Sequence, residues 1–460
     1  MAGRYPRSVT RRYWVETLGC PKNAVDSDKL VGTLLADGLV AARSAGEADL
    51  VVVNTCAFVE DARQESIDTI LALADVRRPG SELVVTGCLA ERYGSELAAA
   101  LPEVDAVVGF GASVNIGAGP RPAPVNIGAG PRPAPVNLGA GPRPAPVTLG
   151  AARRRAIAPA FDLLNLPRPA SAVPWAYVKV AEGCDRACGF CAIPSFRGPQ
   201  RSRTIDAILD EVDQLAVQEI VLVAQDLAAF GRDQGEGERA IVPLVEAVAA
   251  RVPRVRLLYL YPSDLTDRLV EAVCATGVPY FDLSLQHVSR PLLRRMRRWG
   301  DGSRFAARID DIRRREPGAA FRSNFIVGYP GETETDHDDL LAFVERAQLD
   351  WCGFFPYSAE EGTYAAGLDR TVAPGLVAER LAELRGLQDA VTAARRDALV
   401  GLDVEVLVDQ PGVGRTYREA PEIDGVVNVP TSLVAGAFAT VRVTGATGPD
   451  LDAERCDLRR

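Results

Sequence analysis

The sequence lacks the residues and motifs on which several enzyme classes depend. Its 460 residues include only two histidines, His287 and His337, neither of them at metal-ligand spacing. Zinc sites that mix cysteine with histidine are therefore not expected. The HExxH motif of metalloproteases and the GxxxxGK[ST] motif of P-loop enzymes are also missing. We expect structural or polar roles for the two histidines.

Long apolar runs and a surplus of basic residues are missing as well. The sequence has no run of about 18 apolar residues, and its N-terminus lacks the apolar core of a signal peptide. We therefore expect a cytoplasmic protein without a membrane partner. The balance of 52 basic against 61 acidic residues gives a net charge of -9, which favours a basic partner over a phosphate backbone. Thiols stay reduced in the cytoplasm, so the nine cysteines must be metal ligands, nucleophiles or core residues.

Three cysteines occupy the same place in a unit that recurs in the first hundred residues. Each unit is a short apolar strand (13–18, 50–53 and 82–86), then Cys20, Cys56 or Cys88, then a helical pattern. Such alternation is typical of parallel βαβ units, whose strands all end at one edge of the sheet. We expect the three thiols to converge there on an iron-sulfur cluster with one open iron. Three buried core cysteines are the alternative.

The segment that follows is a repeat. From Val114 to Pro146 an 11-residue unit runs three times as VN(I/L)GAGPRPAP. Its prolines and small residues exclude a helix or a central strand and favour an extended linker. A solenoid is not expected, because the period is short and there is almost nothing to bury.

Six strand-like runs alternate with helical patterns further along the chain. The predicted strands are 175–180, 219–224, 255–260, 280–285, 321–327 and 351–355. Six βα repeats are too few for a closed eight-stranded barrel but suit an open partial barrel with a site at the carboxyl ends of its strands. After a helix near 377–399, three short strands at 403–409, 424–430 and 437–443, separated by glycine and proline, predict a small β-barrel.

A C-x3-C-x2-C motif follows the first of these six strands directly. Cys184, Cys188 and Cys191 are soft thiolate ligands at a spacing that lets one loop hold three corners of a four-iron cluster. The open fourth iron can chelate S-adenosylmethionine, and an electron from the cluster can then cleave a carbon-sulfur bond. A structural zinc loop is a weaker interpretation, because zinc prefers four ligands and no further cysteine or histidine lies nearby. Cys274, Cys352 and Cys456 match no motif.

The chain resembles the methylthiotransferases of the radical S-adenosylmethionine (SAM) superfamily along nearly its whole length. The similarity is carried by LGCPKNAVDSD, NTCAFVEDARQESIDTIL, TGCLAERYG, EGCDRACGFCAIPSFRGPQRSR, VLVAQD, LSLQHVSRPLLRRMRR, FIVGYPGET and FPYSAEEGT. The segment GRTYREAPEIDGVV is similar to a terminal TRAM domain. The resemblance implies an α/β fold with a parallel-sheet domain (11–113), a linker (114–169), a radical SAM domain built as a partial (βα)6 barrel (170–399) and a TRAM β-barrel (400–460).

The resemblance also implies the cofactors. Two 4Fe-4S clusters are expected, an auxiliary one on Cys20, Cys56 and Cys88 and a SAM-cleaving one on the cysteines of the motif. Residues at strand ends or beside the cluster loop are expected in the SAM pocket, namely Phe190, Gln225, Asp226 and Gln286.

Within the family the chain is most similar to the members that modify an aspartate of the twelfth small-subunit ribosomal protein. Pro21-Lys22 stands where tRNA-modifying relatives usually carry a glutamine-methionine pair. The resemblance implies that one SAM donates the methyl group. A second SAM would supply the radical that removes hydrogen from the aspartate β-carbon, with electrons from an external donor. The methylthio group, with sulfur from a sulfur donor, would then be transferred from the auxiliary cluster.

Two other functions are kept open. The same chemistry on a tRNA adenosine is one, although residues 401–460 carry ten acidic residues against six arginines, which favours a basic protein partner. A non-catalytic iron-sulfur electron carrier or sensor is the other. The arginine-rich stretch 290–315 is either a docking site for an acidic partner or a solvated helix face.

Overall fold

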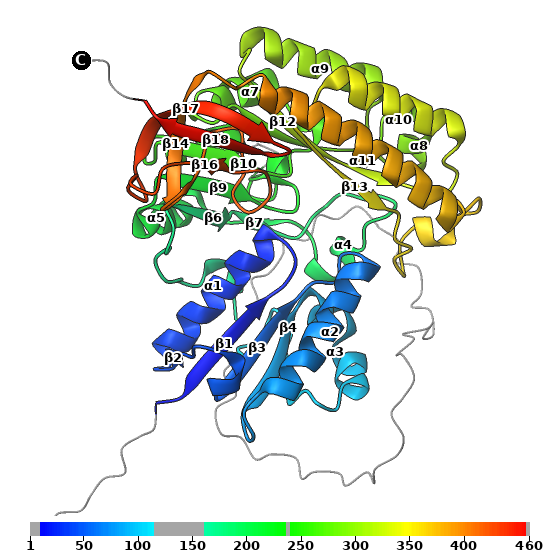
Figure 1. Cartoon of the computed structure of the whole chain (residues 1–460). Helices are drawn as coiled ribbons and strands as arrows, with labels where there is room; N and C mark the ends of the chain where they lie inside the picture. Colours follow the sequence, from blue (N-terminus) through cyan, green and yellow to red (C-terminus); the bar gives the residue numbers. More distant parts are fainter. Residues whose placement is uncertain (1–9, 115–160, 236–239, 457–460) are drawn as a thin grey trace, which may run out of the picture.

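The structure is a computed structural model that describes residues 10–114, 161–235 and 240–456. The predicted repeat linker lies almost wholly outside the described residues. The chain forms a lower part built on a parallel sheet, an upper part with two further parallel sheets, and a small barrel beside the upper part (Figure 1). The expected α/β class is therefore confirmed. No helix within the described ranges is long and apolar enough to cross a membrane.

The lower part is a five-stranded, all-parallel sheet in the order β2-β1-β3-β4-β5. Its strands are β1 (Arg12–Thr17), β2 (Val40–Ala41), β3 (Leu50–Thr55), β4 (Glu82–Gly87) and β5 (Ala106–Val107). Its helices are α1 (Pro21–Ala36), α2 (Glu60–Val76) and α3 (Cys88–Ala100). The central strand β3, LVVVNT, is buried at every position, as a strand covered on both faces should be. The two-residue edge strands were not predicted, because two residues are too few to show alternation.

The upper part contains the six predicted strands. They form two parallel sheets, β10-β9-β6 and β11-β12-β13, which meet at the bridge between Leu260 and Leu283. Their bounds are β6 (Trp175–Lys179), β9 (Glu219–Val223), β10 (Arg254–Leu257), β11 (Tyr280–Gln286), β12 (Ala320–Val327) and β13 (Trp351–Pro356). The strands follow one another in chain order, so the open partial barrel is confirmed. The helices are α4 (Ile193–Arg197), α5 (Ile205–Leu215), α6 (Ile241–Ala249), α7 (Asp267–Cys274), α8 (Arg290–Arg295), α9 (Gly302–Arg315), α10 (Glu334–Ala347) and α11 (Pro374–Asp397). Between β6 and α5 the chain also forms a short hairpin of β7 (Ala181–Glu182) and β8 (Arg201–Ser202).

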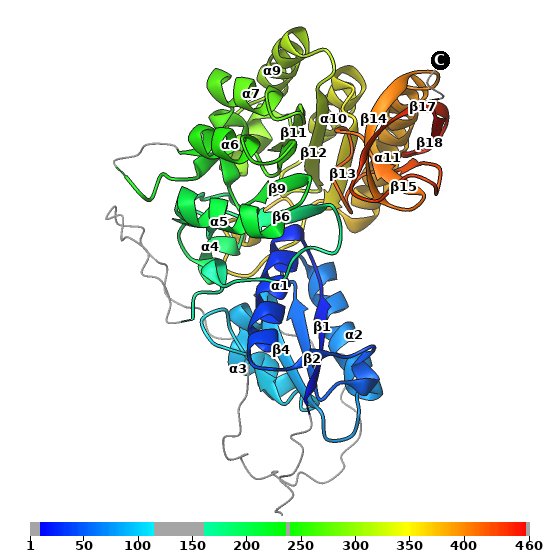
Figure 2. The same cartoon turned by 90° about the vertical axis from the view of Figure 1, so that its left-hand side faces the viewer.

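The two faces of these strands pack against different partners. Ala176 and Val178 of β6 belong to the main core beneath the helices, whereas Trp175 and Tyr177 face a second cluster. Successive side chains of a strand point to opposite faces, which accounts for this division. The second cluster also contains Val25 of α1. The lower part therefore covers one end of the partial barrel, as Figure 2 shows for α1 beneath β6.

The C-terminal barrel is closed by five strands in the order β14-β15-β16-β18-β17. They are β14 (Asp403–Gln410), β15 (Val413–Arg415), β16 (Val427–Asn428), β17 (Phe438–Thr447) and β18 (Asp450–Arg455). Only β14, β16 and β17 were predicted. β15 is three residues long, and β18, DLDAER, is too polar to read as a strand.

A buried ion cluster joins this barrel to the sheet β10-β9-β6 of the upper part. Glu219 of β9 accepts hydrogen bonds from Arg256 Nε (2.8 Å) and from Arg415 Nη1 of β15 (3.0 Å). Arg415 also pairs with Asp409 at 2.6 and 2.9 Å. Burial raises the pKa of Glu219, but the two arginines outweigh it and lower the pKa to about 2. The carboxylate is therefore ionised at neutral pH and compensates two buried cations.

We predict that Glu219→Gln destabilises the protein by about 3 kcal/mol, because it leaves buried arginines short of a counter-charge. Equilibrium urea unfolding at pH 7 measures the loss. The folded pKa near 2 lies below the ordinary value of 4.5. The stabilisation is therefore complete above pH 4.5, and the gap between the two proteins should narrow as pH falls toward 2. Asp403→Asn, which breaks an exposed pair with Arg442, is the control and should change little.

Candidate active site between two cysteine groups

The lower sheet brings Cys20, Cys56 and Cys88 to the same edge. Cys56 and Cys88 directly follow β3 and β4, and Cys20 is the N-cap of α1 after β1. β1, β3 and β4 are parallel neighbours, so their carboxyl ends meet. Gly19, with a φ of +99°, lets the backbone before Cys20 pass Cys56, because a Cβ there would lie 3.0 Å from the Cys56 sulfur. The strand order therefore places the three cysteines at one edge of the lower sheet.

The three thiols differ electrostatically. Burial raises the pKa of Cys56 to about 12, and the nearby Cys20 and Cys88 add to the rise. Burial also raises the pKa of Cys88, against the pull of Arg197. For Cys20 the same burial is outweighed by Lys22, backbone N–H groups and Arg197, so its pKa is lowered. Cys20 is the thiol that loses its proton most easily.

The second group lies on the loop after β6 and β7. Burial raises the pKa of both Cys184 and Cys191 to about 12, and in each case the neighbouring Cys188 thiol adds to the rise. The Cys184 sulfur accepts a hydrogen bond from the backbone N–H of Arg186 (3.4 Å). The Cys188 sulfur accepts one from Arg298 Nη1 (3.3 Å). One residue of the arginine-rich stretch is therefore turned inward onto a thiol.

The thiols of both groups are soft donors of the kind that iron-sulfur clusters take. Among the described residues, no three Cys, His, Asp or Glu side chains lie close enough to hold one metal ion. The thiols nevertheless influence one another within each group, and N–H donors point at the sulfurs. Buried polar atoms near the second loop also have no partner within the described part of the chain, namely Gln225 Oε1, Asp226 Oδ1 and Arg298 Nε. Such atoms suit a polar cofactor, since buried polar groups are normally hydrogen-bonded.

Of the four residues predicted to line the SAM pocket, Gln225 and Asp226 make hydrogen bonds beside the cysteine loop, whereas Phe190 packs against the core and Gln286 ends a strand. Gln225 donates to Glu182 Oε1 (2.6 Å), and Asp226 accepts from Arg186 Nε (2.5 Å), so both hold the cysteine loop in place. Burial raises the pKa of Asp226 and Arg186 partly offsets the rise. Phe190 packs partly buried against the main core, and Gln286 ends β11 with a φ of +72°.

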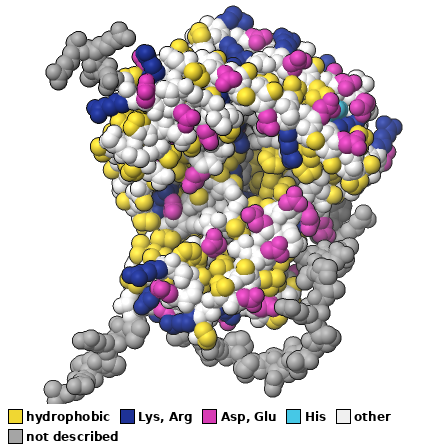
Figure 3. All heavy atoms as spheres, in the orientation of Figure 1, with side chains coloured by type: hydrophobic (Ala, Val, Ile, Leu, Met, Phe, Trp, Pro, Cys, Tyr) yellow, Lys and Arg dark blue, Asp and Glu magenta, His cyan; other side chains and the backbone are white. Residues whose placement is uncertain are grey.

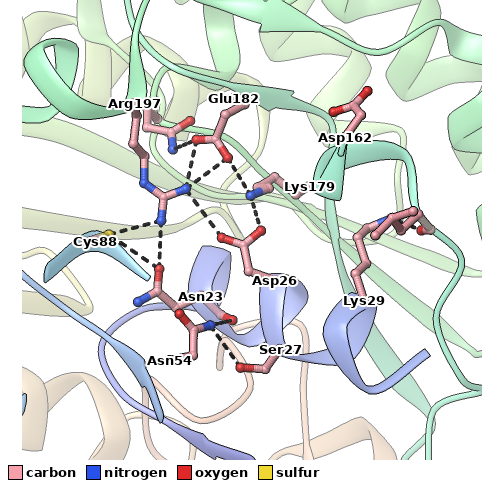
Figure 4. A network of polar contacts seen from close by, with 12 residues as sticks. Asn23, Asp26, Ser27, Lys29, Asn54, Cys88, Asp162, Lys179, Glu182 and Arg197 are labelled. Carbon is pink, nitrogen blue, oxygen red and sulfur yellow. Dashed lines mark hydrogen bonds and ion pairs between the residues drawn. The ribbon is translucent and has the colours of Figure 1, made fainter. Parts of the chain in front are cut away.

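A buried polar network joins Cys88 to Glu182 and Arg197, which flank the second cysteine loop in the sequence (Figure 4). Arg197, at the end of α4, donates to the Cys88 sulfur (3.0 Å), to Asn23 Oδ1 of α1 (2.9 Å) and to both oxygens of Glu182 (2.8 and 2.9 Å). Lys179 of β6 pairs with Asp26 of α1 and lies 2.6 Å from Glu182. Two cations thus face two carboxylates in the contact between the lower sheet and the barrel.

A second ion cluster ties the two parts together at the other side of the site. Glu360 follows β13 and is 2% exposed. It pairs with Arg63 of α2 and with Arg92 of α3 (2.5 Å). Next to it, Ser358 Oγ accepts from the Glu60 N–H (3.1 Å). On this face the molecule is hollowed between its two parts, with hydrophobic atoms in the hollow and acidic side chains along its lower rim (Figure 3).

Sequence reasoning did not identify Arg197, Glu182, Arg298 or Glu360. Each is a single charged residue without a characteristic spacing, and its importance depends on contacts with distant segments. The histidines have structural contacts, as expected. His337 Nε2 lies 2.9 Å from Glu383, and His287 Nδ1 accepts from the Ser289 N–H (3.1 Å).

Three protein-family models match the chain. Residues 12–109 match the uncharacterized protein family UPF0004, residues 178–344 the radical SAM superfamily and residues 400–455 the TRAM domain. The solved radical S-adenosylmethionine methyltransferase TsrM from Kitasatospora setae is 14% identical, with a TM-score of 0.46 over 82% of this chain and 91% of its own. The match over residues 178–344 defines the class of protein as a radical SAM enzyme.

Relatives that align with nearly the full length of the chain show which family of radical SAM enzymes it belongs to. Proteins from Kineococcus radiotolerans and Saccharopolyspora erythraea, both named ribosomal protein uS12 methylthiotransferase RimO, are each 42% identical to this chain. The first alignment covers 97% of both chains, and the second 96% of this chain and 94% of the relative. The chain belongs to the RimO family of radical SAM methylthiotransferases. The alternative function, methylthiolation of a tRNA adenosine, is not favoured by these relatives.

We predict that Glu360→Gln loosens the contact between the two parts at a cost on the order of 3 kcal/mol. The change removes the buried carboxylate that Arg63 and Arg92 share and leaves Arg63 only the exposed Glu60. Hydrogen exchange followed by mass spectrometry should show faster exchange around residues 58–64 and 357–362. The neighbouring Glu361→Gln, at an exposed position, is the matched control. Equal protection in both variants would contradict the role given to Glu360.

Proposed function

We propose that this enzyme attaches a methylthio group to the β-carbon of an aspartate in the small-subunit ribosomal protein uS12. One observation carries the proposal: a residue that closely follows the second cysteine loop contacts a thiol at the edge of the lower sheet. Arg197, six residues after Cys191, reaches across to the Cys88 sulfur (3.0 Å). A reaction that must pass a sulfur-bearing group to a carbon radical needs such an arrangement, with both sources beside one substrate.

Two 4Fe-4S clusters belong to the proposal. Cys184, Cys188 and Cys191 would hold the cluster that binds SAM, and Cys20, Cys56 and Cys88 would hold an auxiliary cluster. When bound, the first cluster supplies the electron that cleaves SAM to an adenosyl radical. One C–H bond of the aspartate is then broken and one C–S bond is formed. The hydrogen leaves as 5′-deoxyadenosine, together with methionine, and the methyl group comes from a second SAM, which leaves as S-adenosylhomocysteine. The sulfur would come from a sulfur donor by way of the auxiliary cluster, and an external donor would supply the electron that cleaves SAM.

The residues of the chain prepare the site for this chemistry. Arg186 lies between Cys184 and Cys188 and pairs with Asp226 (2.5 Å) and with Asp264, which fixes the loop. The Gly189 N–H donates to Met296 O (2.8 Å), and the Gly189 carbonyl accepts from the Ala365 N–H (2.7 Å). A loop held on several sides places its thiols without further rearrangement, which is the preorganisation that catalysis requires.

A basic protein substrate suits the charge of this enzyme. The net charge is -9, and residues 401–460 alone carry ten acidic residues against six arginines. Complementary charge speeds encounter and selects partners. A ribosomal substrate also places the reaction in the cytoplasm. We also propose that the domain boundaries lie at residues 113, 169 and 399, so that the linker separates the domain of the auxiliary cluster from the radical SAM domain and the TRAM domain follows.

We predict about eight irons per chain after anaerobic reconstitution, and about four in either Cys184→Ala/Cys188→Ala/Cys191→Ala or Cys20→Ala/Cys56→Ala/Cys88→Ala, since each trio holds four irons. Iron and sulfide analysis measures both. Cys274→Ala, at the end of α7, should keep about eight. A full iron complement in either triple variant would show that its cysteines are not the ligands.

We predict that the reconstituted enzyme, given SAM, sulfide and a reductant, adds a methylthio group to a single aspartate of purified uS12 and releases 5′-deoxyadenosine. Mass spectrometry of the protein and chromatography of the nucleoside follow the two products. Modification of tRNA adenosine with none of uS12 would overturn the substrate proposal. Absence of 5′-deoxyadenosine would instead favour an electron carrier.

A further inference from the structure

One short segment touches both cysteine groups. The Gly198 carbonyl accepts a hydrogen bond from the Cys184 N–H (3.1 Å), and the side chain of the preceding residue, Arg197, donates to the Cys88 sulfur (3.0 Å). Gly183 allows this close approach, because a Cβ there would lie 2.2 Å from the Pro199 carbonyl oxygen. The Arg197 backbone is therefore fixed beside the radical SAM loop while its guanidinium lies at the auxiliary site.

The contacts of Arg197 require an arginine. Its side chain is 3% exposed and lies over the Phe110 ring, 4.3 Å from the ring centroid. Its planar fork of five donors serves Cys88, Asn23 and Glu182 together, which the single ammonium of a lysine could not do. Glu182 and Asp26 balance charge in this network, but neither accounts for the bond to sulfur. That bond points to a role at the thiolate.

We propose that Arg197 is a positioning residue that raises the reduction potential of the auxiliary cluster and fixes its Cys88 ligand relative to the radical SAM loop. The inference rests on the proposed cluster at Cys20, Cys56 and Cys88. N–H donors to a cluster sulfur, together with a buried positive charge, stabilise the reduced form because it carries one more negative charge. Burial protects this effect from screening by salt.

The test measures the auxiliary cluster alone. The full-length Cys184→Ala/Cys188→Ala/Cys191→Ala variant is reconstituted with iron and sulfide, and its midpoint potential is determined by an EPR-monitored redox titration. In that background we expect Arg197→Gln to lower the equilibrium constant for reduction about tenfold, equivalent to about 59 mV for one electron. Arg197→Lys keeps the charge but loses the fork, so its potential should fall between those of the other two proteins.

Arg203→Gln is the matched control. Arg203 is equally buried, at 3% exposure, but pairs with Glu211 (2.6 Å) and should leave the potential unchanged. The inference is overturned if both Arg197 variants keep the parent potential, or if Arg203→Gln lowers it by as much. If Arg197→Gln does not fold, the potential of Arg197→Lys is compared with that of the parent protein, and an unchanged value overturns the inference. A background protein that binds no cluster would refute the proposed auxiliary site itself, a result distinct from an unchanged potential.

Discussion

The active-site geometry depends on the buried charges between α1 and the start of the partial barrel. Lys179 and Arg197 face Asp26 and Glu182 in a region that excludes water. Burying any one of these charges alone would cost several kcal/mol, roughly the stability of a domain. When they are paired, these charges hold the lower and upper parts of the chain in one relative position. Because the cysteine groups lie on those two parts, the same pairing sets the distance between them.

α1 shows why this contact is hard to foresee. It buries polar side chains at helical spacing, namely Lys22, Asn23, Asp26, Ser27 and Lys29. In an isolated domain such residues would face solvent. Here Lys29 instead pairs with Glu211 of α5 (3.0 Å), Asp26 pairs with Lys179 of β6, and Asn23 accepts a hydrogen bond from Arg197. A polar helix face that is buried indicates a partner elsewhere in the chain, but only the folded chain shows which partner.

Much of the fold could be predicted from local pattern. The six barrel strands and the helices between them have strong apolar periodicity, and β1, β3 and β4 end at cysteines that parallel order must bring together. Elements of two or three residues, such as β2 and β15, have no periodicity to detect. Arg197 and Glu360 were missed for a different reason. Their roles come from pairing across more than one hundred residues of sequence, which no local pattern records.

The arginines around the two cysteine groups make different contacts, according to the part of the chain on which each one lies. Arg186 and Arg298 act on the radical SAM loop, one through carboxylates and one directly on the Cys188 sulfur. Arg63 and Arg92 close the opposite side of the contact through Glu360. Arg197 alone among these five touches a sulfur of the lower sheet while its backbone stays with the upper part. A shift of the two parts relative to each other would therefore change the environment of Cys88 first, so interdomain geometry and auxiliary-site chemistry are coupled through one guanidinium.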